Sequence, residues 1–348
     1  MMKYIIRRVL GFLPVLLSIA AVTFFLARIM PGGPFDFVGD KSLPESVVRN
    51  LEAKYRLDWP MWKQFVSYMV GDELHLGPVL IYDLDPERPT FSYGVMRGDL
   101  GPSFRYRGQS VNDVVGITFP LSAQLGFFAL ILGLVIGIPA GIIAALKQNT
   151  WLDYSATFVA VLGVSIPSLV LAPLFIWIFA LNLGWFPVAN WGAKPPYFQN
   201  MFAAGFDWWN YIEHAAMPVF ILGTGVSAIF ARLMRASLLQ IIREDYIRTA
   251  RAKGLQERWV IYRHALKNGL IPVATVIGPI FAGFITGTLV IEQFFGLNGM
   301  GKLFVQSVTN RDYAMVLGTT LIYAVILVFA NLIVDLTYAF LDPRIRLE

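Results

Sequence analysis

Six long apolar runs constrain the fold of this chain more than any other feature of its sequence. A bilayer core about 30 Å thick needs about 20 predominantly apolar residues in a helix to cross it. Six stretches meet this length: residues 9–30, 119–146, 154–181, 215–238, 270–292 and 316–340. Charged residues make up only 15% of the chain, against about 25% in soluble domains. The sequence therefore predicts an all-α integral membrane protein with six transmembrane helices.

The first apolar run could belong to a cleaved signal peptide or to a retained anchor. Basic residues precede it at Lys3, Arg7 and Arg8, as in a signal peptide. Its length of about 20 residues, however, exceeds the roughly 7–15 residues of a signal-peptide core. It ends at Arg28 without a small-residue cleavage pattern. We therefore expect a retained transmembrane helix.

The distribution of Lys and Arg predicts the orientation of the spans, because short cytoplasmic loops retain basic residues. Alternating the six spans from a cytoplasmic N-terminus places thirteen bases inside: Lys3, Arg7, Arg8, Lys147, Arg243, Arg248, Arg251, Lys253, Arg258, Arg263, Lys267, Arg344 and Arg346. The two short outside loops hold only three bases: Lys194, Lys302 and Arg311. We expect a multi-pass protein of the plasma or inner membrane with both termini in the cytoplasm.

The spans divide the chain into four parts. These are a cytoplasmic tip with the first helix (1–30), an extracytoplasmic insertion (31–118), a five-helix core (119–340) and a cytoplasmic tail (341–348).

The insertion carries signals for short helices and strands. Ser42 and Glu45 match a capping box that would open one helix. A second helix is expected after Asp58-Trp-Pro60, with Trp62, Phe65, Val66 and Met69 on one apolar face. With Trp59 nearby, this face suits either the membrane interface or packing within the insertion. Residues 80–82 and 90–93 are expected to form short strands.

Two glycine series indicate close helix packing. Gly133, Gly137 and Gly141 lie four residues apart in the second span, and Gly283 and Gly287 repeat the spacing in the fifth. Such stripes let helix backbones approach closely. The contact could lie inside one subunit or between subunits.

The segment 244–272 is the most cationic part of the chain. Seven bases lie between residues 243 and 267, and Gly254 separates two stretches that we predict to be short helices. An ordinary positive-inside loop explains the charge. It does not explain the small Ala250 and Ala252 beside Gly254, nor the return to the membrane at Pro272. Small residues at a turn would let the loop pack into a cavity of another protein.

Several motifs together resemble a known transporter family. The loop sequence Thr249-Ala-Arg-Ala-Lys-Gly254, followed by Pro272, resembles the "EAA" coupling loop of ABC-importer permeases. The form from Asp245 to Leu255, ending in His264-Ala-Leu-Lys-Asn268, is similar to the dipeptide/oligopeptide/nickel branch, and specifically to its B-type subunit. Further matches are Tyr4-Ile-Ile-Arg-Arg-Val, Pro31-Gly-Gly-Pro, Gly98-Asp-Leu-Gly101-Pro-Ser103, Gly296-Leu-Asn-Gly-Met-Gly301, Arg311-Asp-Tyr313 and Leu341-Asp-Pro-Arg-Ile-Arg346. Two departures are Thr249 in place of an acidic residue and extra sequence near residues 72–97.

This resemblance implies a type I importer fold in which the chain forms half of a translocation pathway. The implied partners are a second permease, two cytoplasmic ABC ATPases and an extracytoplasmic peptide-binding protein. The ATPase-coupling residues would be Tyr246, Arg248, Ala250, Ala252, Lys253, Gly254 and His264. The loop would pass rigid-body motion of the ATPases to the helices. Peptides are the expected cargo; nickel chelates or oligosaccharides are the alternatives, and a self-sufficient secondary transporter is the rival function.

The sequence gives no sign of a nucleotide-binding, catalytic or metal site in the chain itself. The run from Gly296 to Leu303 nearly matches a P-loop, but Leu303 replaces the hydroxyl that would hold Mg²⁺. There is no cysteine, and the three histidines lack metal-ligand spacing. We therefore expect a non-catalytic subunit without cofactor or metal, with membrane lipid but no nucleic acid as a partner. The intramembrane Asp335 lies about five residues from the cytoplasmic end of its span, so we expect it to snorkel to that end or to pair with Arg232 or Arg235.

Overall fold

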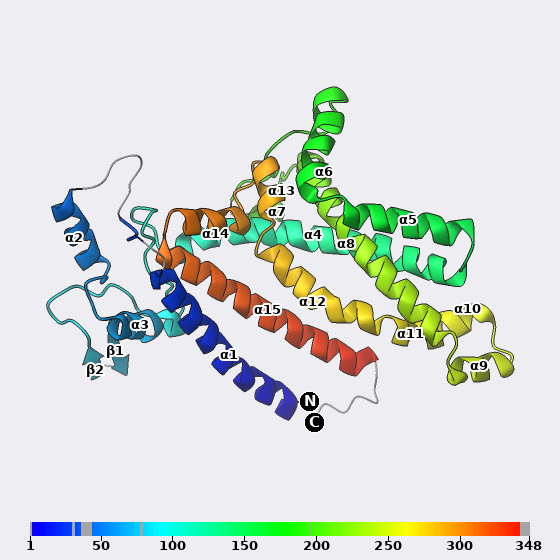
Figure 1. Ribbon diagram of the computed structural model, residues 1–348, viewed down its shortest axis with the longest axis horizontal. Helices are drawn as coiled ribbons and strands as arrows, with labels where there is room; N and C mark the ends of the chain where they lie inside the picture. The colour runs from blue at the N-terminus through cyan, green and yellow to red at the C-terminus, as the bar shows by residue number, and fades with distance from the viewer. Residues whose placement is uncertain (1, 30–31, 36–43, 77–78, 196, 342–348) are drawn as a thin grey trace. The chain divides into compact units, whose positions relative to one another are not determined.

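The described residues are mostly helical, with one two-stranded sheet. A computed structural model describes residues 2–29, 32–35, 44–76, 79–195 and 197–341 (Figure 1). The long helices are α1 (Met2–Ile29), α4 (Val111–Leu146), α5 (Trp151–Ser165), α8 (Trp208–Ile241), α12 (Ile271–Ile285) and α15 (Tyr313–Leu341). The shorter helices are α2 (Glu45–Lys54), α3 (Met61–Val70), α6 (Ser168–Phe175), α7 (Tyr197–Met201), α9 (Asp245–Ala252), α10 (Glu257–Trp259), α11 (Leu266–Gly269), α13 (Leu289–Phe294) and α14 (Met300–Thr309). A 3₁₀ turn η1 (Val95–Arg97), the π-helical turns η2 (Ile176–Asn182) and η3 (Val260–Ala265), and the strands β1 (Glu73–Leu76) and β2 (Val79–Asp83) complete the described elements.

The helices and strands gather into two compact units. The first unit comprises Met1–Val9, Pro120–Gly299 and Ile326–Glu348; the second comprises Leu10–Phe119 and Met300–Val325.

Within the described residues, five helical segments are long and apolar enough to cross a membrane. They are Ile6–Ile29, Val111–Leu146, Trp208–Ile241, Ile271–Phe294 and Tyr313–Thr337. They confirm five of the six predicted spans. The sixth, predicted as one span over 154–181, is instead a pair of helical segments, Trp151–Gly163 and Ser168–Asn182, bent by 95°. Ile166 is extended (φ −93°, ψ 114°) immediately before Pro167, because a proline disfavours helical geometry in the residue that precedes it.

The glycines of α4 pack against α8 of the same chain. A Cβ built at Gly137 would lie 2.5 Å from the carbonyl oxygen of Ser227, and one at Gly141 would lie 2.5 Å from that of Ala231. Gly133 approaches the carbonyl oxygen of Gly223 in the same way, at 3.2 Å. This stripe therefore serves packing inside the subunit, one of the two alternatives left by the sequence.

The second predicted glycine stripe is not a helical face. Helix α12 ends at Ile285, and Gly287 has a positive φ of 108° beyond it. No heavy atom lies within 4 Å of a Cβ built at Gly283. The spacing of four residues therefore misled the prediction, because the helix ends between the two glycines.

Ion pairs in the first unit differ from the predicted pairing of Asp335. Asp335 pairs with Arg8 of α1. Arg235 instead forms a bidentate salt bridge with Asp153 of α5, and both N–O distances are 2.7 Å. Asp153 is buried, so it needs this partner more than a half-exposed carboxylate would.

The helices of the insertion begin at prolines. Helix α3 starts after Pro60, as predicted. Helix α2 starts after Pro44, without a side-chain cap. The capping-box prediction was therefore wrong for the position of this helix start, and Ser42 itself lies outside the described residues. Trp59 is buried beneath the ammonium group of Lys63, 3.9 Å from its ring centroid. Trp62 on the predicted apolar face is 63% exposed, so both alternatives for that face stay open.

Residues 80–82 lie in β2, which pairs antiparallel with β1 and confirms one predicted strand. Residues 90–93 are not a strand. The backbone N–H groups of Phe91 and Tyr93 donate instead to the carboxylates of Asp72 (2.8 Å) and Asp99 (2.7 Å). Side-chain acceptors thus replace a neighbouring strand.

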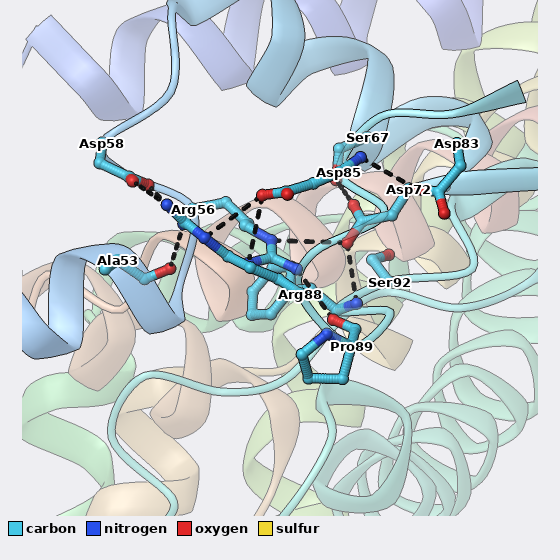
Figure 2. A network of polar contacts seen from close by, with 12 residues as sticks. Ala53, Arg56, Asp58, Ser67, Asp72, Asp83, Asp85, Arg88, Pro89 and Ser92 are labelled. Carbon is cyan, nitrogen blue, oxygen red and sulfur yellow. Dashed lines mark hydrogen bonds and ion pairs between the residues drawn. The ribbon is translucent and has the colours of Figure 1, made fainter.

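A polar network ties α2, β2 and the following loop together (Figure 2). Arg88 binds both carboxylate oxygens of Asp58, at 2.9 and 3.3 Å, and donates to the carbonyl oxygen of Ala53 at 3.1 Å. The buried Arg56 donates to the carbonyl oxygen of Pro89 at 2.8 Å. The segment near residues 72–97, which looked like extra sequence, is therefore an integral part of the insertion.

Candidate functional site

The loop 244–272 begins with a helix that packs on the first unit. Helix α9 follows Glu244, whose extended backbone marks the helix start. Ile247 and Ala250, three residues apart and so on one face, are buried in a hydrophobic cluster with Phe230 and Leu238 of α8. The opposite face of α9 is exposed. The amphipathic pattern of α9 thus determines which of its side chains are buried and which remain exposed to solvent.

A tight turn at Gly254 ends the first helix. Gly254 has φ +78°, and no heavy atom lies within 4 Å of a Cβ built on it. Glycine is therefore required here by backbone conformation and not by lack of space. Helix α10 begins at Glu257, which confirms the predicted pair of short helices around Gly254.

The second half of the loop buries one face and exposes aromatic rings on the other. Val260, Ile261 and Ala265 are buried in the same cluster as α9. Trp259 and Tyr262 are 51% and 68% exposed. The turn η3 that holds Tyr262 is π-helical, a distortion often found at functional sites.

Two side-chain contacts close the loop on itself. Arg251 of α9 binds both carboxylate oxygens of Glu257 in α10, at 2.7 and 3.1 Å. Hydrogen bonding from Arg251 lowers the pKa of Glu257. The amide of Asn268 donates to the hydroxyl of Tyr246 at 3.0 Å. We call the Arg251–Glu257 contact the clasp.

The structure divides the seven predicted site residues between two faces. Arg248, Ala252, Lys253 and Gly254 are exposed, Tyr246 is 42% exposed, and His264 is partly exposed. Ala250 instead faces the chain's own core. Its small side chain allows α9 to lie close to α8, so it positions the loop.

Sequence reasoning missed the residues that hold the loop in shape. Arg251 and Asn268 appear in the motifs of the loop, but the sequence assigns no role to either side chain, nor to Glu257. Opposite charges flanking a glycine turn, six residues apart, were the available signal for the clasp.

The exposed surface of the loop is cationic and aromatic. It carries both basic side chains and large aromatic rings: Arg248, Lys253, Arg258, Trp259, Tyr262 and Arg263. A hollow of about 580 Å³ adjoins the loop's start, lined by Leu239, Gln240, Arg243, Glu244 and Asp245. Such a surface suits a protein partner with an apolar groove and an acidic rim. Among the described residues, no group of three or more His, Cys, Asp or Glu side chains could hold a metal ion.

Two family models and a set of close relatives match this chain. The model "Binding-protein-dependent transport system inner membrane component" matches residues 137–347, and its N-terminal counterpart matches residues 1–79. The chain is 40% identical to the oligopeptide transport system permease protein OppB of Salmonella typhimurium, over 99% of this chain and 100% of the relative. It is 39% identical to the dipeptide transport system permease protein DppB of Bacillus subtilis, over 100% of this chain and 99% of the relative. The chain therefore belongs to the family of inner membrane components of binding-protein-dependent transport systems.

Proposed function

We propose that this inner-membrane transport component carries di- or oligopeptides. The observation that carries the proposal is identity of 39–40% along essentially the whole chain to relatives named for oligopeptide and dipeptide transport. Nickel chelates and oligosaccharides remain the alternative cargoes within the same architecture.

The loop 244–272 is the proposed contact with the ATPases that drive transport. Tyr246, Arg248, Ala252, Lys253, Gly254 and His264 would meet the partner, while Ala250 would hold α9 against the core. The exposed bases and rings support this assignment. Because the loop connects α8 to α12, movement of the loop by a partner would be transmitted to both of these membrane helices.

The clasp would make the loop a rigid lever. A loop that bends under load would absorb the motion of its partner, whereas one closed by the Arg251–Glu257 pair would transmit it as a unit. The exposure of this pair makes it modest as a source of stability, which fits a role in stiffness.

The complete importer would contain a second permease, two ATPase subunits and a peptide-binding protein on the far side of the membrane. Both termini and the loop 244–272 would lie in the cytoplasm, and the insertion 31–118 would face outward. The distribution of Lys and Arg supports this orientation.

Reconstitution tests the proposed cargo. The chain would be placed in liposomes with its cognate permease, ATPases and binding protein, and uptake of radiolabelled di- to pentapeptides would be measured with ATP inside. We expect ATP-dependent peptide uptake that excess unlabelled peptide suppresses and that nickel chelates or oligosaccharides leave unchanged. Uptake of a chelate or sugar but no peptide would refute the cargo. Uptake without any ATPase subunit would refute the importer itself and favour a secondary transporter.

A further inference from the structure

A small cavity lies inside the second unit, apart from the loop. It is bordered by the end of α1, by α3, by the segment 91–104 and by the start of α15. Its volume is about 40 Å³, and one water molecule needs about 10–15 Å³ in the same measure. The cavity therefore has room for a few waters or for one monatomic ion.

Arg28, near the end of α1, lines this cavity and has no acidic partner among the described residues. Its Nε donates to the Gln64 amide oxygen at 2.8 Å, and one terminal nitrogen donates weakly to the Phe24 carbonyl at 3.4 Å. Its guanidinium carbon lies 3.5 Å from the Phe24 ring centroid. All three contacts are with neutral groups, and no carboxylate of the described residues lies within 4 Å of it. Ring contacts offset only part of the cost of removing a cation from water.

Two further lining residues have polar atoms without a hydrogen-bond partner. The hydroxyl of Tyr68 is buried and has no partner among the described residues, and the same holds for Nε of Arg56. Burial raises the pKa of Tyr68 well above its usual range, so its hydroxyl remains a proton donor. The cavity thus has two buried donors for which the described residues supply no acceptor.

The neighbouring carboxylates do not make the cavity negative. Asp72 lies 3.6 Å from Nε of Arg56, and its oxygens accept from the hydroxyl of Ser67 and the backbone N–H of Phe91 (Figure 2). Asp312 accepts from the hydroxyl of Ser103 at 2.5 Å and from the N–H groups of residues 104 and 105 at 3.2 Å. Among the described residues, Arg28 is therefore the lining cation that has no carboxylate within 4 Å, whereas Arg56 has Asp72 and Asp85.

We propose that this cavity binds one monatomic anion, chloride in physiological salt, between the Arg28 guanidinium and the Tyr68 hydroxyl. An anion supplies both the missing charge and the missing acceptor, whereas water supplies only the acceptor. The small volume of about 40 Å³ leaves no room for a large anion. Bound there, the anion would tie the end of α1 to α3.

Radioactive chloride tests the proposal by equilibrium dialysis against the full-length chain, purified in detergent with its cognate permease and ATPases. We expect saturable binding of one chloride per copy of this chain. Arg28→Gln and Tyr68→Phe should each weaken binding by tenfold or more. Arg88→Gln is the matched control, because Arg88 belongs to the adjacent network but does not line the cavity. It should leave binding unchanged.

A second measurement keeps the proposal falsifiable if Arg28→Gln does not fold. At a chloride concentration ten times the dissociation constant, the ratio of folded to unfolded protein should rise about elevenfold. The unfolding midpoint should therefore be higher in chloride than in gluconate at equal ionic strength, and Tyr68→Phe should remove most of this difference. Absence of saturable binding, or binding that both cavity variants retain, would show that the cavity holds only water.

Discussion

Gly254 and Ala250 show how two small residues in one loop serve different purposes. Gly254 lies in open space but has a left-handed backbone conformation. Ala250 lies within α9 and is buried in the hydrophobic cluster. The sequence suggested one shared reason, contact with a partner. The structure separates them into a conformational requirement and a packing requirement.

Gly254→Ala should strain the turn, because a Cβ at positive φ costs about 1–2 kcal/mol. We expect at least a several-fold loss of ATP-dependent uptake, with less ATPase co-purifying. Gly184→Ala is the matched control: Gly184 also has a positive φ of 63° and open surroundings, but lies outside the loop. Equal losses in both variants, or full coupling in Gly254→Ala, would contradict the role of the turn.

At the scale of elements, the fold depends on close packing between helix faces and on ion pairs that join the two ends of a turn. The stripe of α4 on α8 illustrates the first, and the clasp across Gly254 illustrates the second. Each can be tested by substitution together with a matched second variant.

Gly137→Ala should destabilise the first unit by about 1–3 kcal/mol, because the added Cβ would overlap the Ser227 carbonyl. Gly116 lies in the same helix with nothing within 4 Å of a built Cβ. Gly116→Ala should therefore be neutral or slightly stabilising. Thermal unfolding of the detergent-solubilised protein measures both, and an unchanged midpoint for Gly137→Ala would contradict the packing described here.

Glu257→Gln should open the clasp with a small loss of stability, about 0.2–1 kcal/mol as for other exposed pairs, but a clear loss of coupled ATPase activity. The charge swap Arg251→Glu with Glu257→Arg should restore part of the coupling. Transport-stimulated ATP hydrolysis provides the readout. A swap no better than the single variants would mean that the two residues act separately.

The clasp should also depend on pH in a defined direction. Arg251 lowers the pKa of Glu257 in the folded protein, so the pair's contribution is complete above the unfolded value of about 4.3. It is lost as pH falls through the lower, folded pKa. Local hydrogen exchange in α9 and α10 should thus be constant from pH 6 to 8 once corrected for intrinsic rates, and opening of the loop in that range would contradict this assignment.

Much of this architecture could be predicted, because hydropathy and basic residues act over whole helices. Five spans and the two-helix loop followed from such patterns. The bend before Pro167 did not, since apolar content is the same on both sides of it. The pairing of Asp335 with Arg8 was also missed, because the two residues are far apart in sequence and only the fold brings them together. Strand propensity likewise failed at residues 90–93, where the acceptors are the side chains of Asp72 and Asp99.

At the scale of the whole molecule, the family assignment makes the chain one component of a larger transport system. Its own residues would supply the pathway and the contact for the ATPases. The absence of cysteine from the sequence makes orientation directly testable.

Single cysteines at Ser46 and Gln256, both exposed, should react with a membrane-impermeant maleimide from opposite sides. We expect Ser46→Cys to be labelled in intact cells and Gln256→Cys only after the membrane is opened. The cysteine-free parent is the control for background labelling. Labelling of both positions from outside would overturn the proposed orientation.

The bend before Pro167 decides the parity of membrane crossings. Its two arms, Trp151–Gly163 and Ser168–Asn182, are about 20 and 22 Å long at 1.5 Å per residue, and each falls short of a core of about 30 Å. Together with five other crossings, a bent pair that crosses places the chain's two ends on the same face. A pair that dips in and returns gives an odd count and places them on opposite faces. The path of this bent pair through the membrane thereby determines whether the two ends of the chain share a compartment.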